Sequence, residues 1–168
     1  MRTPLPSGLQ LDMDLGPATI AAFYRELDAG SRYNRFLGLV SEEGLNAHVE
    51  RALRENTQFV GLRVAGELVG LAEISAAPTC EIALALRREH QGMGLGGFLF
   101  ETALLVARGR GAESVTSATN RGNQPMVRLA QRVGMRAPPC YGGFWEGARQ
   151  LEPDDAGVSA YALCGTPA

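Results

Sequence analysis

A run of glycines at the start of a helix constrains the fold of this chain more than any other feature. The run is Gln91-Gly92-Met93-Gly94-Leu95-Gly96-Gly97, and it separates a stretch with strand periodicity from a stretch with helical periodicity. Because glycine has no Cβ, the backbone here can adopt positive φ and a ligand can approach it closely. The helix that follows presents free amides and the positive end of its dipole to this turn. The segment therefore predicts a strand–turn–helix unit that binds an anion such as a phosphate group.

The periodicity on both sides of this turn predicts one α/β domain. Consecutive strands joined by short turns favour an antiparallel part, and the strand–helix–strand unit from 81 to 119 favours a parallel crossover. Residues 1–8 are interpreted as a flexible tail and 9–168 as a single domain. The predicted elements are, in order, a strand at 9–14, helices from 17 to 30 and from 41 to 53, strands at 57–64, 67–75 and 81–86, a helix from 95 to about 109, a strand at 114–119, a helix at 124–133, and strands at 141–145 and 158–164.

The composition excludes several classes of function. The formal net charge of -2 gives no electrostatic reason to expect a nucleic-acid partner. The sequence contains no lysine, so it has neither a P-loop lysine nor a Schiff-base lysine. Cys80, Cys140 and Cys164 lack the spacing of a zinc or redox site, and no metal is expected. We expect no membrane partner, because no signal-peptide pattern or membrane-length apolar run occurs, and we expect a cytoplasmic protein of a GC-rich bacterium.

Two nucleotide-binding motifs are alternative interpretations of the glycine run. A P-loop is excluded because Gly-Lys-Ser/Thr is missing. Gly92, Gly94 and Gly97 do have the G-x-G-x-x-G spacing of a dinucleotide fold. However, a polar stretch at 87–91 separates the first glycine from the strand, and the next strand ends at Thr119 rather than at an acidic residue. A nicotinamide-binding protein therefore stays as a weaker alternative.

Two segments resemble the GCN5-related N-acetyltransferase (GNAT) family. The glycine run is similar to its Q/R-x-x-G-x-G/A signature, and Asn120 to Met126 with Leu129 and Gly134-Met135 is similar to its N-x-x-M-x-x-L…G-F segment. The similarity in element order covers about Leu9 to Leu163. A closer resemblance is to bacterial Pat-type protein-lysine acetyltransferases, in Tyr24-Arg25-Glu26-Leu27, Ser31-Arg32-Tyr33-Asn34-Arg35-Phe36 and Cys80-Glu81-Ile82-Ala83-Leu84. The family resemblance implies a GNAT fold, in which a mixed central sheet of six to seven strands is flanked by about four helices.

The resemblance also implies acetyl-CoA as cosubstrate and places it on the chain. The strand residues Leu84, Ala85 and Leu86 are expected to line the pantetheine, and Asn123 to bond near it or hold the two strands apart. The acetyl carbonyl is expected against a backbone amide of the 81–86 strand, polarised as in an oxyanion hole. The pyrophosphate is expected on the amides of Gln91, Gly92, Met93, Gly94, Leu95, Gly96 and Gly97.

Direct attack by an amine on the thioester needs a general base, because an alkyl ammonium is protonated at neutral pH. The resemblance assigns this role to Glu81. The alternative interpretation of Glu81 is a solvated carboxylate at a strand end without a catalytic role. Glu73 is the second candidate for the base. Many family members carry a tyrosine as general acid after the leucine of the last helix, and here Ala130 stands there. Tyr33, Tyr141 or solvent is expected to replace it, unless the thiolate leaves unassisted.

The sequence does not specify the acceptor amine, which is either a protein lysine or a small molecule. Tyr33, Arg35 and Phe36 fall where the family's acceptor-side loop lies, and homodimers are common in the family. Arg88 and its neighbour Arg87 are interpreted as CoA-phosphate ligands, as contacts to an acidic substrate, or as solvated surface. The alternative function is a non-catalytic acyl-CoA-binding sensor or scaffold, and His48 is interpreted simply as a helix-face residue.

Overall fold

The computed structural model describes residues 6–139 and 142–152. The strands are β1 (Leu9–Asp12), β2 (Gln58–Val64), β3 (Glu67–Ile74), β4 (Thr79–Leu86), β5 (Ser114–Asn120) and β6 (Phe144–Gln150). The helices are α1 (Pro17–Glu26), α2 (Ala29–Phe36), α3 (Glu42–Arg54), α4 (Leu95–Gly109) and α5 (Gln124–Arg132), with a short 3₁₀ helix η1 (Arg88–His90). The fold is therefore α/β, as predicted.

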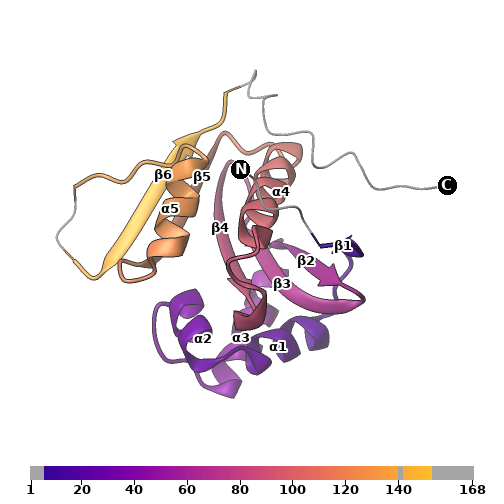
Figure 1. The fold of residues 1–168 in the computed structure, drawn as a ribbon. Helices are drawn as coiled ribbons and strands as arrows, with labels where there is room; N and C mark the ends of the chain where they lie inside the picture. Colours follow the sequence, from indigo (N-terminus) through magenta and orange to yellow (C-terminus); the bar gives the residue numbers. More distant parts are fainter. Residues whose placement is uncertain (1–5, 140–141, 153–168) are drawn as a thin grey trace.

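The six strands form one mixed sheet, ordered β1-β2-β3-β4-β5-β6. All neighbours are antiparallel except β4 and β5, which are parallel and joined by the α4 crossover. The pairing of β4 with β5 covers only Thr79–Glu81 against Ser114–Thr116, although both strands continue further. Figure 1 shows the two strands diverging beyond that point. This divergence creates the opening in which the candidate site lies.

Two hydrophobic clusters cover the two faces of the sheet. On one face, α1 and α3 pack through side chains such as Tyr24 and Leu45 against Leu71 of β3. On the other face, α4 and α5 pack through side chains such as Leu99 and Ala130. Each helix buries the apolar stripe that its 3.6-residue periodicity predicts. The sheet is thus anchored on both faces near the divergence of β4 and β5.

The prediction for the first helix was wrong in one respect. The helix expected to run to Gly30 ends at Glu26, and a separate helix, α2, begins at Ala29. The Asp28 side chain accepts hydrogen bonds from the amides of Gly30 and Ser31, both at 3.1 Å, and so caps α2. An N-terminal aspartate cap is a local signal that was present in the sequence but was not recognised. Ser41 caps α3 in the same way, since its Oγ accepts from the Gly44 amide at 3.1 Å.

The strand expected at 141–145 begins three residues later and ends five residues later than predicted. β6 begins at Phe144 and extends to Gln150, in antiparallel register with β5. Residues 140–141 and the strand expected at 158–164 lie outside the described residues. Among the helices described in 6–139 and 142–152, none combines the length and hydropathy that crossing a bilayer requires.

Candidate active site

A cleft of about 750 Å³ lies between the diverging strands β4 and β5. One wall is formed by β4 from Ala83 to Leu86, and the opposite wall by β5 at Ala118 and Thr119 together with α5. The glycine turn closes one end, and α2 contributes residues including Asn34 and Arg35. Because β4 pairs with β5 only as far as Glu81, the main-chain groups of later β4 residues on this edge have no strand partner. The cleft therefore offers an extended ligand both a strand edge and a nest of amides.

The glycine turn has the backbone geometry that the sequence predicted. Gly92 and Gly94 have φ of 76° and 81°, a region that favours glycine, and a Cβ on either would meet nothing within 4 Å. Gly94 is the residue preceding α4. In the described part of the chain, no amide from Gly92 to Gly97 donates to a main-chain carbonyl, whereas the Gln91 amide is bound to Arg88 O at 3.2 Å. The turn thus presents unpaired donors beside the positive end of the α4 dipole, a combination that binds phosphate groups.

Most of the residues expected to hold the cofactor do line this cleft. Met93 and Leu95 are the exceptions: the Met93 side chain is exposed, and the Leu95 side chain is fully buried in the core. Their amides still belong to the turn. The expected residues that line the cleft are Leu84, Ala85, Leu86, Gln91, Gly92, Gly94, Gly96, Gly97 and Asn123.

Side-chain amides tie the elements around the cleft together. Gln91 Nε2 donates to Leu86 O at 3.1 Å and to Ser31 Oγ at 3.2 Å, which joins the glycine turn to β4 and α2. Asn123 Nδ2 donates to Thr119 Oγ1 at 3.0 Å, which fixes the start of α5 against β5. These bonds show that the expected ligands Gln91 and Asn123 also shape the cleft in the absence of a ligand.

Glu81 stands where β4 and β5 part, at the last residue pair that the two strands share. Its Cα partner on β5 is Thr116, and its amide donates to Ser75 Oγ at 2.8 Å. The residue is exposed and does not itself line the cleft. Because side chains alternate along a strand, Glu81 lies on the same face of β4 as Ala83, which does line the cleft. Its carboxylate therefore lies beside the end of the cleft where β4 and β5 join, and it is exposed to solvent.

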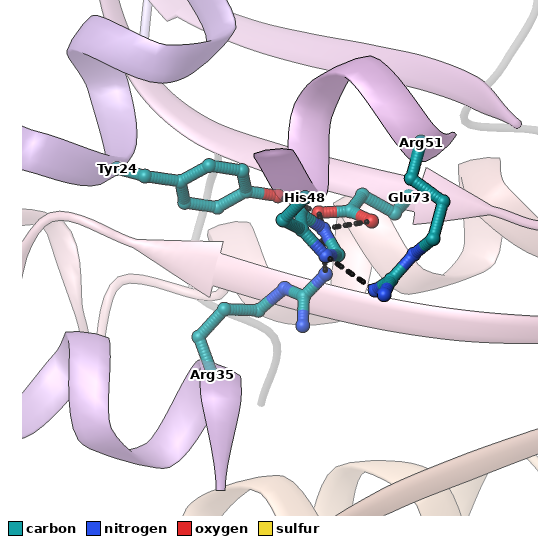
Figure 2. A network of polar contacts seen from close by, with 5 residues as sticks. All are labelled: Tyr24, Arg35, His48, Arg51 and Glu73. Atoms are coloured by element: carbon teal, nitrogen blue, oxygen red, sulfur yellow. Dashed lines mark hydrogen bonds and ion pairs between the residues drawn. The ribbon is translucent and has the colours of Figure 1, made fainter. Parts of the chain in front are cut away.

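Glu73, the second candidate for the base, belongs instead to a buried polar cluster (Figure 2). Its carboxylate accepts from Tyr24 Oη, forms an ion pair with Arg35, and has both oxygens 3.0 Å from His48 Nε2. Arg51 completes the cluster, with Nη2 3.4 Å from His48 Nδ1. The interpretation of His48 as a plain helix-face residue was therefore incomplete, because these partners come from four elements that sequence spacing does not connect.

The cluster keeps Glu73 ionised and weakly basic. Burial on its own would raise the pKa of the Glu73 carboxyl, but Arg35 and the hydrogen bonds from His48 and Tyr24 outweigh it and lower the pKa to about 2. Burial, followed by the negative charge of Glu73, raises the pKa of Tyr24 well above its usual value, so this phenol stays a donor. A carboxylate with all of these partners is poorly suited to take a proton from an amine, which argues against Glu73 as the base.

The lowered pKa of Glu73 predicts an acid-dependent loss of stability. We expect Glu73→Gln to reduce the free energy of unfolding at pH 7 by on the order of 3 kcal/mol, because it leaves the Arg35 charge buried and unpaired. A lowered folded-state pKa contributes stability above the ordinary value of 4.5 that is lost as the pH falls towards 2. The difference in the free energy of unfolding between wild type and Glu73→Gln, measured by urea unfolding, should thus decrease between pH 4.5 and pH 2.

An exposed carboxylate provides the matched control for this stability prediction. Glu50→Gln on α3 removes an exposed carboxylate and should change the free energy of unfolding by less than about 0.5 kcal/mol at each pH. A Glu73→Gln penalty that stayed constant down to pH 2 would contradict the assigned direction of the Glu73 shift.

The residues considered for the general acid and for phosphate binding are also placed. Ala130 is fully buried and Tyr33 is 45% exposed on α2, while Tyr141 lies outside the described residues. Arg87 forms an ion pair with Glu26 (Nη2 to Oε2, 2.6 Å), and its Nε donates to Leu68 O at 2.9 Å, so its role is structural. Arg88 lines the cleft and is 78% exposed, with Nη1 3.8 Å from Asp28. Only Arg88 of the two arginines is therefore placed to meet a ligand.

Comparisons with known proteins agree with this geometry. Residues 22–135 match the model of the acetyltransferase (GNAT) family. Acetyltransferase PA5475 of Pseudomonas aeruginosa is 31% identical over 128 residues, which is 69% of each chain. The GNAT domain of S. lividans PAT has a TM-score of 0.68 at 19% identity, over 85% of this chain and 89% of that one.

A structure with bound ligand has the same fold. This structure, yncA from Salmonella typhimurium with its cofactor acetyl-CoA, has a TM-score of 0.68 at 17% identity, over 87% of this chain and 95% of that one. The expected GNAT fold is thus confirmed, and the described residues form five α-helices in place of about four because α2 is a separate helix. The chain belongs to the GNAT family of acetyltransferases, enzymes whose acetyl donor is acetyl-CoA.

Proposed function

We propose that this protein transfers the acetyl group of acetyl-CoA directly to a primary amine. The observation that carries the proposal is the set of unpaired amides from Gly92 to Gly97 at one end of an open strand edge. A diphosphate accepts hydrogen bonds from such amides and is stabilised by the dipole of α4. The pantetheine then extends along Leu84–Leu86 towards the point where β4 and β5 join.

The acetyl group is placed near the inner end of the cleft in this arrangement. Its carbonyl accepts from an unpaired main-chain amide of β4, which polarises it for attack, as in an oxyanion hole. The acceptor amine approaches from the face of β4 that carries Ala83 and Glu81. The tetrahedral intermediate collapses with loss of the CoA thiolate, and the amine proton leaves to a base.

Glu81 is the base in this proposal. It is exposed, it lies on the acceptor face beside the end of the cleft, and its main chain is fixed by Ser75. A carboxylate there takes the proton directly or through one water molecule. Glu73 is disfavoured since its oxygens are occupied by Tyr24, Arg35 and His48 and its pKa is lowered.

A thiol-release assay tests the activity. We expect CoA release from acetyl-CoA to depend on an added amine when the protein is tested with polyamines, amino acids, aminoglycosides and lysine peptides. The chain itself contains no lysine side chain to acetylate, so mass spectrometry after incubation with acetyl-CoA should find at most N-terminal modification, and CoA release without added amine is the background to subtract. Binding of acetyl-CoA without turnover on every acceptor class would favour the alternative, a non-catalytic acyl-CoA-binding sensor or scaffold.

A further inference from the structure

Arg35 reaches from α2 into the polar cluster and also lines the cleft. Its side chain is 9% exposed and pairs with Glu73 through Nη2. The guanidinium lies over the rings of Tyr24 and Phe36, with Cζ 5.5 Å and 4.8 Å from their centroids. These contacts hold the group in one orientation, which suits it to present its remaining donors to a ligand.

Some donors of Arg35 have no acceptor in the described part of the chain. Its Nε is fully buried without a hydrogen-bond partner, and the interactions of the side chain with Glu73 and His48 both use Nη2. Figure 2 shows the other terminal nitrogen directed away from the cluster. An unpaired buried donor is costly unless an acceptor is supplied. The cleft is the space from which a ligand can supply one.

The register of the sheet places this arginine next to the reaction centre. Glu73 and Ala83 are Cα partners across β3 and β4, and Ala83 lines the cleft just beyond Glu81. Paired residues share a face of the sheet, so the Arg35–Glu73 pair lies on the acceptor side. A group that contacts Arg35 is therefore attached to the acceptor, close to its reacting amine.

The charge balance selects the kind of group. The Glu73 carboxylate already neutralises the buried Arg35 guanidinium, and the second cation of the cluster, Arg51, is exposed and screened by solvent, so a second carboxylate would gain little. A neutral carbonyl oxygen accepts from the free guanidinium donors without this penalty. We infer that Arg35 forms a subsite for an acceptor carbonyl oxygen, so that amines of amino-acyl or peptide groups are preferred to simple alkylamines. This inference rests on the proposed acetyl transfer to an amine.

Matched acceptors with and without a carbonyl group test the subsite. The pairs are alaninamide with isopropylamine, and glycinamide with ethylamine. The ratio of kcat/KM within each pair is compared between wild type and the variant Arg35→Met/Glu73→Gln, which removes both buried charges together. Intrinsic amine reactivity cancels in this comparison. In the double variant we expect the ratio of kcat/KM, carbonyl-bearing amine over alkylamine, to fall at least 10-fold in one pair, because the KM for the carbonyl-bearing acceptor rises. The affinity of the double variant for acetyl-CoA should stay within about 3-fold of wild type.

A control variant in the polar cluster and a direct NMR measurement on Arg35 complete the test of the subsite. Tyr24→Phe disturbs the cluster but leaves the Arg35–Glu73 pair, and it should keep the wild-type ratio. The Nε–H resonance of Arg35 in the wild-type CoA complex should shift with the carbonyl-bearing amine and not with its alkyl partner. An unchanged ratio in the double variant, or equal shifts with both amines, would overturn the inference even where amine acetylation is observed. Absence of any amine-dependent CoA release would instead count against the proposed function, and the resonance would still decide on the subsite.

Discussion

Replacement of Gly94 by aspartate is expected to lower the affinity for acetyl-CoA about 100-fold relative to replacement by asparagine. Both residues tolerate the positive φ of 81° at this position better than other side chains, and a Cβ there meets no atom within 4 Å. They differ in one charge. At about 6 Å and an effective dielectric constant of about 40, a carboxylate and a doubly charged diphosphate repel by about 3 kcal/mol. Calorimetric titration of acetyl-CoA into the two variants measures this difference.

Gly111 provides a control with the same backbone geometry. Its φ is 82°, a Cβ there also meets nothing within 4 Å, and it follows the end of α4 remote from the glycine turn. We expect Gly111→Asp and Gly111→Asn to bind acetyl-CoA equally, within about 3-fold of wild type. Equal affinities of the two Gly94 variants would mean that the diphosphate lies elsewhere.

Removal of the Glu81 carboxylate is expected to cause a large loss of kcat. We expect Glu81→Gln to reduce kcat by roughly 10²–10⁴-fold at neutral pH, the usual contribution of a general base. Acetyl-CoA affinity should be unchanged, because Glu81 does not line the cleft. The kcat of the variant should also lose the pH dependence that the base imposes on the wild type. Steady-state thiol release over a pH series, with calorimetric acetyl-CoA binding, checks both parts.

The control for Glu81 is another exposed carboxylate on the sheet. Glu146 lies on β6, two strands from β4, and Glu146→Gln should keep kcat within about 3-fold of wild type. A Glu81→Gln variant with near-normal kcat would remove Glu81 from the mechanism and leave solvent to accept the proton. It would not affect the assignment of the cofactor turn, which stands on separate residues.

The fold and the geometry of the glycine turn could be predicted because their signals are local. The glycine run sits directly between a strand and a helix, and both its positive φ values and the start of α4 follow from neighbouring residues. The capping serine at 41 and the hairpin around Ala65-Gly66 are likewise short-range features. The mixed sheet could also be predicted, since consecutive hairpins favour antiparallel pairs and the strand–helix–strand unit favours one parallel pair.

The polar cluster around Glu73 could not be predicted because its members are distant in sequence. Tyr24 and Glu73 are separated by 49 residues, and His48 and Glu73 by 25. The periodicity of α3 identifies His48 only as a residue of a helix face, and the apolar neighbours of Glu73 suggest a strand but no partner. The helix α2, which carries Arg35, was missed because its start depends on the Asp28 cap rather than on an apolar stripe.

The most direct test of the account is an amide chemical-shift titration of the protein with acetyl-CoA and with acetylpantetheine. Acetylpantetheine keeps the thioester and lacks the diphosphate. We expect acetyl-CoA to shift the amides of Gly92 to Phe98 most strongly, whereas acetylpantetheine should bind at least about 100-fold more weakly and shift mainly the amides of β4. Equal affinities for the two ligands, or amides in the glycine turn that do not respond to acetyl-CoA, would contradict it.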